Sequence, residues 1–153
     1  MPLDIYSYSV GKGAQDHRSS EGPLVIQTSP YLTPIKNQLI WKHQPLSCNH
    51  AVSGQAATPY ISQVSTQLAQ HVFDSALHKK RFLTLGGGHS CDIGTWSGAA
   101  HAAHLQQKRL GLIWIDAHMD SHTHDTSESQ NIHGMPLAAL LGHGNPALTN
   151  ILS

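Results

Sequence analysis

Three side chains that can bind a metal ion stand at alternate positions after an apolar run. The run Gly111–Ile115 is followed by Asp116, His118 and Asp120. In an extended chain, residues at i, i+2 and i+4 point the same way, so these three side chains can converge on one point. Carboxylate and imidazole groups together suit a divalent ion such as manganese, and carboxylates can bridge two such ions. We therefore predict a metal site with room for two ions.

Another histidine stands at the end of a second apolar run. Arg81–Leu85 is predicted to be a strand that leads into glycines 86–88 and then His89. Glycine carries no Cβ, so it lets the backbone turn sharply there. The run Gly111–Ile115 is rich in β-branched and aromatic residues, which predicts a strand buried on both faces of a parallel sheet. Because α/β proteins bind ligands at the carboxyl ends of their strands, both runs should deliver their polar residues to one rim.

Three motifs together resemble those of the arginase family of ureohydrolases. They are GGGHS at 86–90, DAHMD at 116–120 and SQNIHGMP at 129–136. The stretch Val10–Leu32 is also similar to the family's opening strand, loop and first helix. Family members are dimanganese enzymes that hydrolyse guanidino groups and release urea. The resemblance spans nearly the whole chain, and it implies an α/β fold with three layers and a mostly parallel sheet, as in arginases and deacetylases.

The resemblance also implies a role for each motif residue. His89, Asp116 and Asp120 would bind the first manganese ion. Asp116 would bridge to the second ion, which His118 would also bind. In the family, a hydroxide shared by the two ions attacks the guanidinium carbon. His133 would shuttle a proton to or from the leaving group, because the pKa of imidazole lies near the operating pH. The residues expected to hold the substrate or support the site are Ser127, Ser129, Asn131 and His122.

Three positions depart from the family pattern. Gly88 stands where the family commonly has an aspartate before the metal-binding histidine, which removes a carboxylate that could support His89. His122 stands where arginases usually have an asparagine that contacts the α-carboxylate, and Gln130 replaces a glycine. Arginine, agmatine and other guanidino or formimino compounds therefore all remain open as substrates.

The chain, at 153 residues, is shorter than members of the family. Their second half carries an Asp-x-Asp pair that completes both metal shells, together with acidic residues that hold the cationic end of the substrate. We therefore expect residues 1–153 to be the N-terminal part of a single arginase-like α/β domain, able to bind one manganese ion or none by itself. The resemblance also places strands of that second half between the strand before His89 and the strand before Asp116, so we expect a gap in the sheet.

Three functions follow from these observations. The first is an arginase-like hydrolase that converts arginine to ornithine and urea, complete only with a complementing C-terminal segment or as part of a longer gene product. A homo-oligomer is a further expected partner state. The second is a noncatalytic remnant that binds a single divalent ion. The third is an inactive α/β fragment with an unusual content of 13 histidines. Replacing Asp116 with Ala separates the first two functions from the third. Both the hydrolase and the remnant should bind manganese and lose it on this change, whereas the inactive fragment has no bound manganese to lose.

Composition narrows the class of partner. Nine basic and nine acidic residues give no electrostatic case for binding nucleic acid or a membrane surface. The cysteines, Cys48 and Cys91, predict no disulfide framework. The N-terminus lacks the features of a signal peptide, and no apolar run approaches the roughly 20 residues that span a bilayer. We expect a cytoplasmic chain.

The remaining elements alternate between strand and helix. The order β, helix, β, helix, β predicts an α/β fold. Apolar residues at near-helical spacing mark the longest helix. The predicted strands are Ile5–Val10 and Gln38–His43, the helices are Ile61–Lys80 and Thr95–Lys108 with another beginning at Met135–Leu141, and the segment Pro45–Pro59 is predicted to be a loop.

Overall fold

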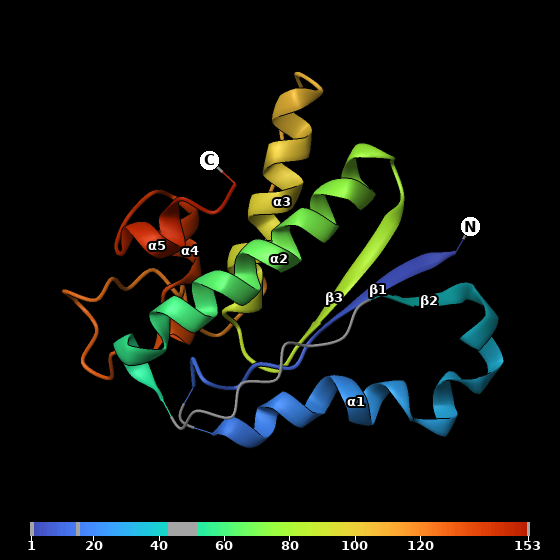
Figure 1. Ribbon diagram of the computed structural model, residues 1–153, viewed down its shortest axis with the longest axis horizontal. Coiled ribbons are helices and arrows are strands. Elements are labelled where there is room, and N and C mark those ends of the chain that lie inside the picture. The colour runs from blue at the N-terminus through green and yellow to red at the C-terminus, as the bar shows by residue number, and fades with distance from the viewer. Residues whose placement is uncertain (1, 15, 43–51, 153) are drawn as a thin grey trace.

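A computed structural model of the chain describes residues 2–14, 16–42 and 52–152 (Figure 1). The described residues form a small parallel sheet with helices on both faces, which confirms the α/β fold class. The strands are β1 (Leu3–Tyr8), β2 (Leu39–Lys42) and β3 (Arg81–Gly86). The α-helices are α1 (Gly22–Gln27), α2 (Thr58–Leu77), α3 (Cys91–Leu105), α4 (Pro136–Leu140) and α5 (Pro146–Thr149). Short 3-10 helices cover His17–Glu21, Pro30–Gln38, Gly54–Ala57 and Ile132–Gly134.

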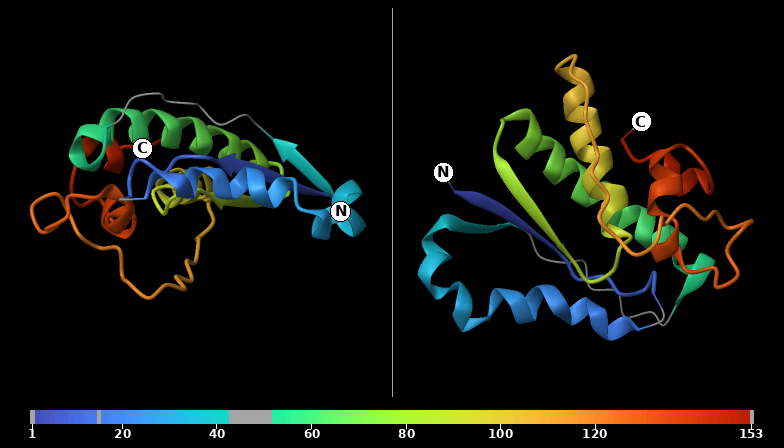
Figure 2. Two further views of the ribbon diagram at one scale, coloured as in Figure 1. Left: turned by 90° about the horizontal axis from the view of Figure 1, so that it is seen from below. Right: turned by 180° about the vertical axis from the view of Figure 1, so that it is seen from behind.

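The sheet has the strand order β2-β1-β3, with every pair parallel. Leu3 lies opposite both Leu39 and Arg81, and Tyr8 lies opposite Gly86 at the other end of β3. The chain moves from β1 outward to β2 and then crosses back over β1 to β3. With right-handed connections, this reversal places α1 and α2 on opposite faces of the sheet (Figure 2). The central strand β1 is largely buried, as a strand covered on both faces must be.

Helices α2 and α3 pack close together, because α3 carries glycine on its contact face. A Cβ at Gly94 would lie 2.5 Å from the carbonyl oxygen of Ser65, and a Cβ at Gly98 would lie 2.3 Å from that of Ala69. Neither position has room for a larger residue. The apolar stripe of α2 completes this layer of the core through Ile61, Val64, Leu68 and Val72, all of which are buried.

Most predicted elements are present with shifted ends. Helix α2 begins at Thr58, inside the predicted loop Pro45–Pro59, because Pro59 fits the first turn of a helix. Residues 45–51 of that loop lie outside the described residues, as does His43 at the end of the second predicted strand. Helix α3 begins at Cys91, four residues before the predicted start at Thr95.

The predicted buried strand Gly111–Ile115 is wrong. This segment has no regular secondary structure, and the side chains of Ile113 and Ile115 are 83% and 93% exposed. A strand needs a neighbour for its backbone hydrogen bonds. Within the described ranges, the sheet ends at β3 and offers 111–115 no partner, which agrees with the expected gap.

Across residues 2–14, 16–42 and 52–152, no helix is both long and apolar enough to cross a bilayer.

Candidate metal centre

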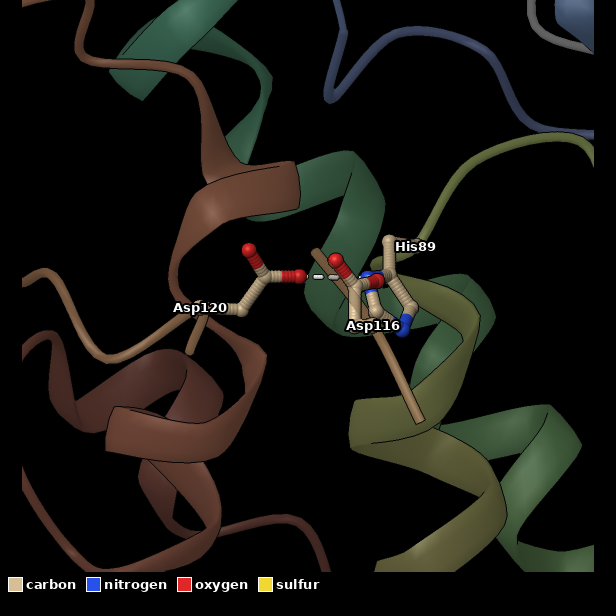
Figure 3. A group of neighbouring side chains, drawn as sticks. All are labelled: His89, Asp116 and Asp120. Atoms are coloured by element: carbon tan, nitrogen blue, oxygen red, sulfur yellow. Dashed lines mark ion pairs between the residues drawn. The ribbon is translucent and has the colours of Figure 1, made fainter. Parts of the chain in front are cut away.

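The side chains of His89, Asp116 and Asp120 converge on one point (Figure 3). One ligand atom from each lies within 4.8 Å of the others. The Nδ1 atom of His89 is 3.3 Å from Oδ2 of Asp116 and lies still closer to Oδ2 of Asp120. The two motifs predicted to supply metal ligands, GGGHS and DAHMD, therefore meet in space.

The position of His89 is fixed by the glycine turn that follows β3. A Cβ at Gly87 would lie 2.7 Å from Cα of Ser20, and a Cβ at Gly88 would lie 2.9 Å from the carbonyl oxygen of Val10. The turn is thus pressed against the loop after β1, where only glycine fits. It delivers His89 to the carboxyl end of the sheet, directly before α3.

The two aspartates are held by backbone hydrogen bonds. The amide of His118 donates to Oδ1 of Asp116 at 2.7 Å, which closes a tight bend. Asp120 has a positive φ of 50°, a conformation that aspartate tolerates better than most residues. Its carbonyl accepts a hydrogen bond from the amide of Leu137 at 3.0 Å, so the first turn of α4 anchors it.

Local charges favour the ionised form of Asp116. The hydrogen bond from the amide of His118 lowers the pKa of the Asp116 carboxyl, and the nearby imidazole of His89 lowers it further. In contrast, burial raises the pKa of Asp92, which lies on the other side of His89. Asp116 is therefore available as a carboxylate to a cation.

His118 lies outside this group. Its side chain is 82% exposed, and its Nδ1 atom is 3.5 Å from Oδ1 of Asp116. The common direction predicted from an extended chain does not hold, because residues 116–118 form a bend and Asp120 has a positive φ. Asp116 and Asp120 nevertheless converge on His89. The role of His118 as a ligand of a second ion stays a prediction.

His133 is placed by a contact with the loop after β1. Its amide donates to the carbonyl oxygen of Gly13 at 3.0 Å. Its Nδ1 atom is buried and has no hydrogen-bond partner within the described part of the chain. A buried polar atom without a partner costs free energy. The role of His133 as a proton shuttle stays a prediction.

The serines predicted to bind substrate organise their own turn. The hydroxyl of Ser127 accepts a hydrogen bond from the amide of Gln130 at 3.0 Å, and the hydroxyl of Ser129 accepts one from the amide of Asn131 at 3.3 Å. Asn131 is itself buried. His122 has its Nδ1 atom 3.2 Å from Oγ1 of Thr126.

Gln130, which replaces a family glycine, adopts a left-handed conformation with φ of 57°. Glycine reaches this region at low cost, whereas a residue with a side chain is strained there. The side-chain amide of Gln130 donates to the carbonyls of His124 and Ser127, which offsets part of that strain.

Two contacts of His89 were not predicted from the sequence. Oδ2 of Asp92 lies 3.0 Å from Nε2 of His89, and the ring of Trp114 stacks on the imidazole with centroids 4.9 Å apart. The spacing i, i+3 at a helix start is the signal that could have identified Asp92. A cavity of about 290 Å³ adjoins the site, between β3, α3 and residues 113–115.

The donor set fits a hard or borderline divalent ion. One imidazole nitrogen and two carboxylate oxygens are ligands that manganese and similar ions accept. They lie beyond the carboxyl end of a parallel strand, where α/β proteins place their ligands. The fold and these side chains define an α/β protein with a candidate metal centre.

The chain belongs to the arginase family, since the family model described as "Arginase family" matches residues 4–152. It is 51% identical to the arginase of Bacillus caldovelox over 92 residues, which are 60% of this chain and 29% of that protein. The structure matches 99% of this chain to 50% of Bacillus subtilis arginase, with a TM-score of 0.79 and 30% identity. It matches 98% of this chain to 53% of Entamoeba histolytica arginase, solved in complex with L-ornithine, with a TM-score of 0.83 and 25% identity. The chain thus spans about half the length of these solved arginases. In the sequence comparison, less than a third of the Bacillus caldovelox arginase aligns with it.

Proposed function

We propose that this chain supplies the N-terminal half of a manganese site that hydrolyses a guanidino compound, with arginine as the substrate. One observation carries the proposal: His89, Asp116 and Asp120 converge within 4.8 Å in a chain of the arginase family. Manganese bound there would lower the pKa of its water, which provides a nucleophile near neutral pH. The chain's own residues would hold the ion through one imidazole nitrogen and two carboxylates.

His133 is the proposed proton shuttle of this site. Its buried Nδ1 atom has no hydrogen-bond partner among the described residues. It would meet a bound molecule only once the completed site opens a path to this nitrogen. The hydrogen bond from its amide to Gly13 fixes the backbone that carries it. Imidazole suits this task because its pKa lies near neutral pH.

The chain by itself is proposed to bind one ion without turnover. Only three ligand atoms converge within the described residues, and His118 is turned outward with 82% of its side chain exposed. A second ion would have too few ligands to be held. This geometry favours a single-ion state until a complementing partner supplies further carboxylates.

The proposed partner is a C-terminal arginase segment that adds strands beside β3. The sheet of the described residues ends at β3, and the adjoining cavity of about 290 Å³ is lined by Phe82, Thr84, Ile113 and Ile115. Backbone groups at the β3 edge can pair with an added strand. The exposed apolar side chains of 113–115 would then be covered.

The test combines metal content with activity. After loading with manganese, elemental analysis should find about one ion per chain, and the same sample should release no urea from arginine. Asp116→Ala should lose the ion, whereas Asp125→Ala should keep it, since Asp125 is an exposed residue of the same loop outside the ligand group. Unchanged manganese in Asp116→Ala would refute the site.

Adding the C-terminal half of the Bacillus caldovelox arginase tests the second part of the proposal. Urea release should appear in the mixture and should depend on Asp116 and His133. Arginine and agmatine should be compared in that mixture, because the two differ by the α-carboxylate. Arginine is the proposed substrate because the Entamoeba histolytica relative binds L-ornithine, which carries that group.

A further inference from the structure

His89 has a different neighbour on each of its two ring nitrogens. Its Nδ1 atom faces Asp116 and Asp120 in the candidate metal centre. Its Nε2 atom lies 3.0 Å from Oδ2 of Asp92, in the first turn of α3. Asp92 is the described carboxylate within ion-pair distance of that nitrogen. The ring therefore bridges the metal ligands and a carboxylate that is not one of them.

A carboxylate beside the second ring nitrogen is a common support of a metal-binding histidine. Such a histidine commonly donates its other ring N–H to a carboxylate, which fixes the tautomer and the ring orientation. With the hydrogen on Nε2, the lone pair of Nδ1 points toward Asp116 and Asp120. The Asp92 side chain is only 23% exposed, and its second oxygen accepts a weak hydrogen bond from Sγ of Cys91 at 3.6 Å. Both carboxylate oxygens are thus held in place.

The backbone explains why this carboxylate comes from α3. The residue before His89 is Gly88, where the family commonly has an aspartate. A Cβ at Gly88 would lie 2.9 Å from the carbonyl oxygen of Val10, closer than such contacts occur. A side chain at 88 would force the glycine turn away from the loop after β1. One helical turn later, Asp92 reaches His89 without this conflict.

We infer that Asp92 is a positioning residue that holds His89 ready to bind a metal ion through Nδ1, in place of the carboxylate absent at Gly88. This inference depends on the proposed metal centre. A carboxylate in the first turn of α3 also stabilises the helix through its dipole. The two roles differ in what they predict, because a dipole effect changes stability and leaves metal affinity unchanged.

The test measures the affinity for manganese in four variants, by electron paramagnetic resonance of the free ion. Asp92→Ala should weaken binding roughly 10- to 100-fold. Asp92→Asn removes the charge but keeps an oxygen that accepts the Nε2 hydrogen, so it should weaken binding less. Asp125→Ala removes one negative charge from the loop of Asp116 and Asp120 without touching His89, so it should bind like wild type. His89→Gln should lose the ion.

Two further readouts separate the inference from its alternatives. The unfolding midpoint of each metal-free variant shows how much of any change is a loss of stability. In protein loaded with Zn²⁺, the Nε2–H proton of His89 should be seen by NMR in wild type and lost to fast exchange in Asp92→Ala. Equal manganese affinity in wild type and Asp92→Ala would overturn the role of Asp92 alone. Equal affinity in wild type and His89→Gln would overturn the metal centre itself.

Discussion

The imidazole of His89 stacks on the indole of Trp114, with ring centroids 4.9 Å apart and an angle of 26° between the planes. His89 follows β3, whereas Trp114 lies in the segment Gly111–Ile115, which pairs with no strand of the described residues. The stack is therefore a direct link between the glycine turn and the segment that leads to Asp116. It helps to bring the ligands from two separate motifs together.

Trp114→Ala is expected to weaken manganese binding about 2- to 10-fold, since an aromatic pair of this kind contributes about 0.5–1.5 kcal/mol. Trp114→Phe keeps a ring for the stack and should bind nearly as well as wild type. The affinity of both variants can be measured by titration with manganese. Equal affinities for Ala, Phe and Trp at this position would show that the stack does not position His89.

Gly98→Ala is expected to destabilise the protein by about 1–3 kcal/mol, because a new Cβ would overpack the contact between α2 and α3. The Cβ would lie 2.3 Å from the carbonyl oxygen of Ala69, so the helices must separate. Gly111→Ala is the matched control, since a Cβ there meets no atom within 4 Å. Urea unfolding of both variants tests the prediction, and equal stabilities would contradict it.

The elements around this helix contact were predictable because their signals are local. The apolar stripe of α2 marks a helix by its own period, and the run before His89 marks a strand that β1 then pairs with. The ends were less predictable, since Pro59 begins α2 within a segment whose composition indicates a loop. Local sequence thus determines the kind of element better than its boundaries.

The segment Gly111–Ile115 shows where such reasoning fails. Its composition is that of a buried strand, but a strand forms only when a neighbour accepts its hydrogen bonds. That neighbour is absent from the described residues, so the side chains of Ile113 and Ile115 lie in solvent. The meeting of His89, Asp116 and Asp120 was predicted because both apolar runs end at one rim, and the resemblance assigned the ligand roles. The contacts of Asp92 and Trp114 with His89 depend on packing that neither motif reveals.

Gln130→Gly is expected to be more stable than Gln130→Ala by about 1 kcal/mol, because alanine keeps the strain of a left-handed φ and glycine relieves it. Both variants lose the hydrogen bonds of the side-chain amide, so the comparison isolates the backbone. At Gln106, where φ is −86°, the order of Gly and Ala should reverse. Thermal unfolding of the four variants is the measurement. A less stable Gly variant at position 130 would contradict the φ of 57° found there.

Cys91 is expected to be inert toward thiol reagents in the folded protein. Burial raises the pKa of its thiol, so the reactive thiolate is not formed near neutral pH. In a Cys48→Ser background, labelling should be slow without denaturant and complete in urea. Rapid labelling of the folded chain would show that the core around α3 opens readily.

The raised pKa of the Cys91 thiol also predicts how the stability of the Cys48→Ser protein depends on pH. The folded thiol has a raised pKa, so its contribution to stability is present below about pH 8.5, the pKa of an unfolded cysteine, and is lost as the pH rises above it. Cys91→Ala should flatten this part of the pH profile. If stability falls with rising pH in the same way in Cys91→Ala, the loss of stability at alkaline pH comes from other groups.

Ile115→Lys is expected to have opposite effects on the isolated chain and on the complemented enzyme. In the isolated chain, Ile115 is 93% exposed next to the open edge of β3, so a charge there should reduce self-association. With the C-terminal half of the Bacillus caldovelox arginase present, the segment is proposed to become a buried strand, and burying a lysine there is costly. Ile115→Lys should therefore abolish urea release from the mixture, whereas Ile115→Val should retain it. Sedimentation of the chain alone and a urea assay of the mixture measure the two effects. Full urea release by Ile115→Lys would mean that 111–115 stays outside the sheet even in the completed site.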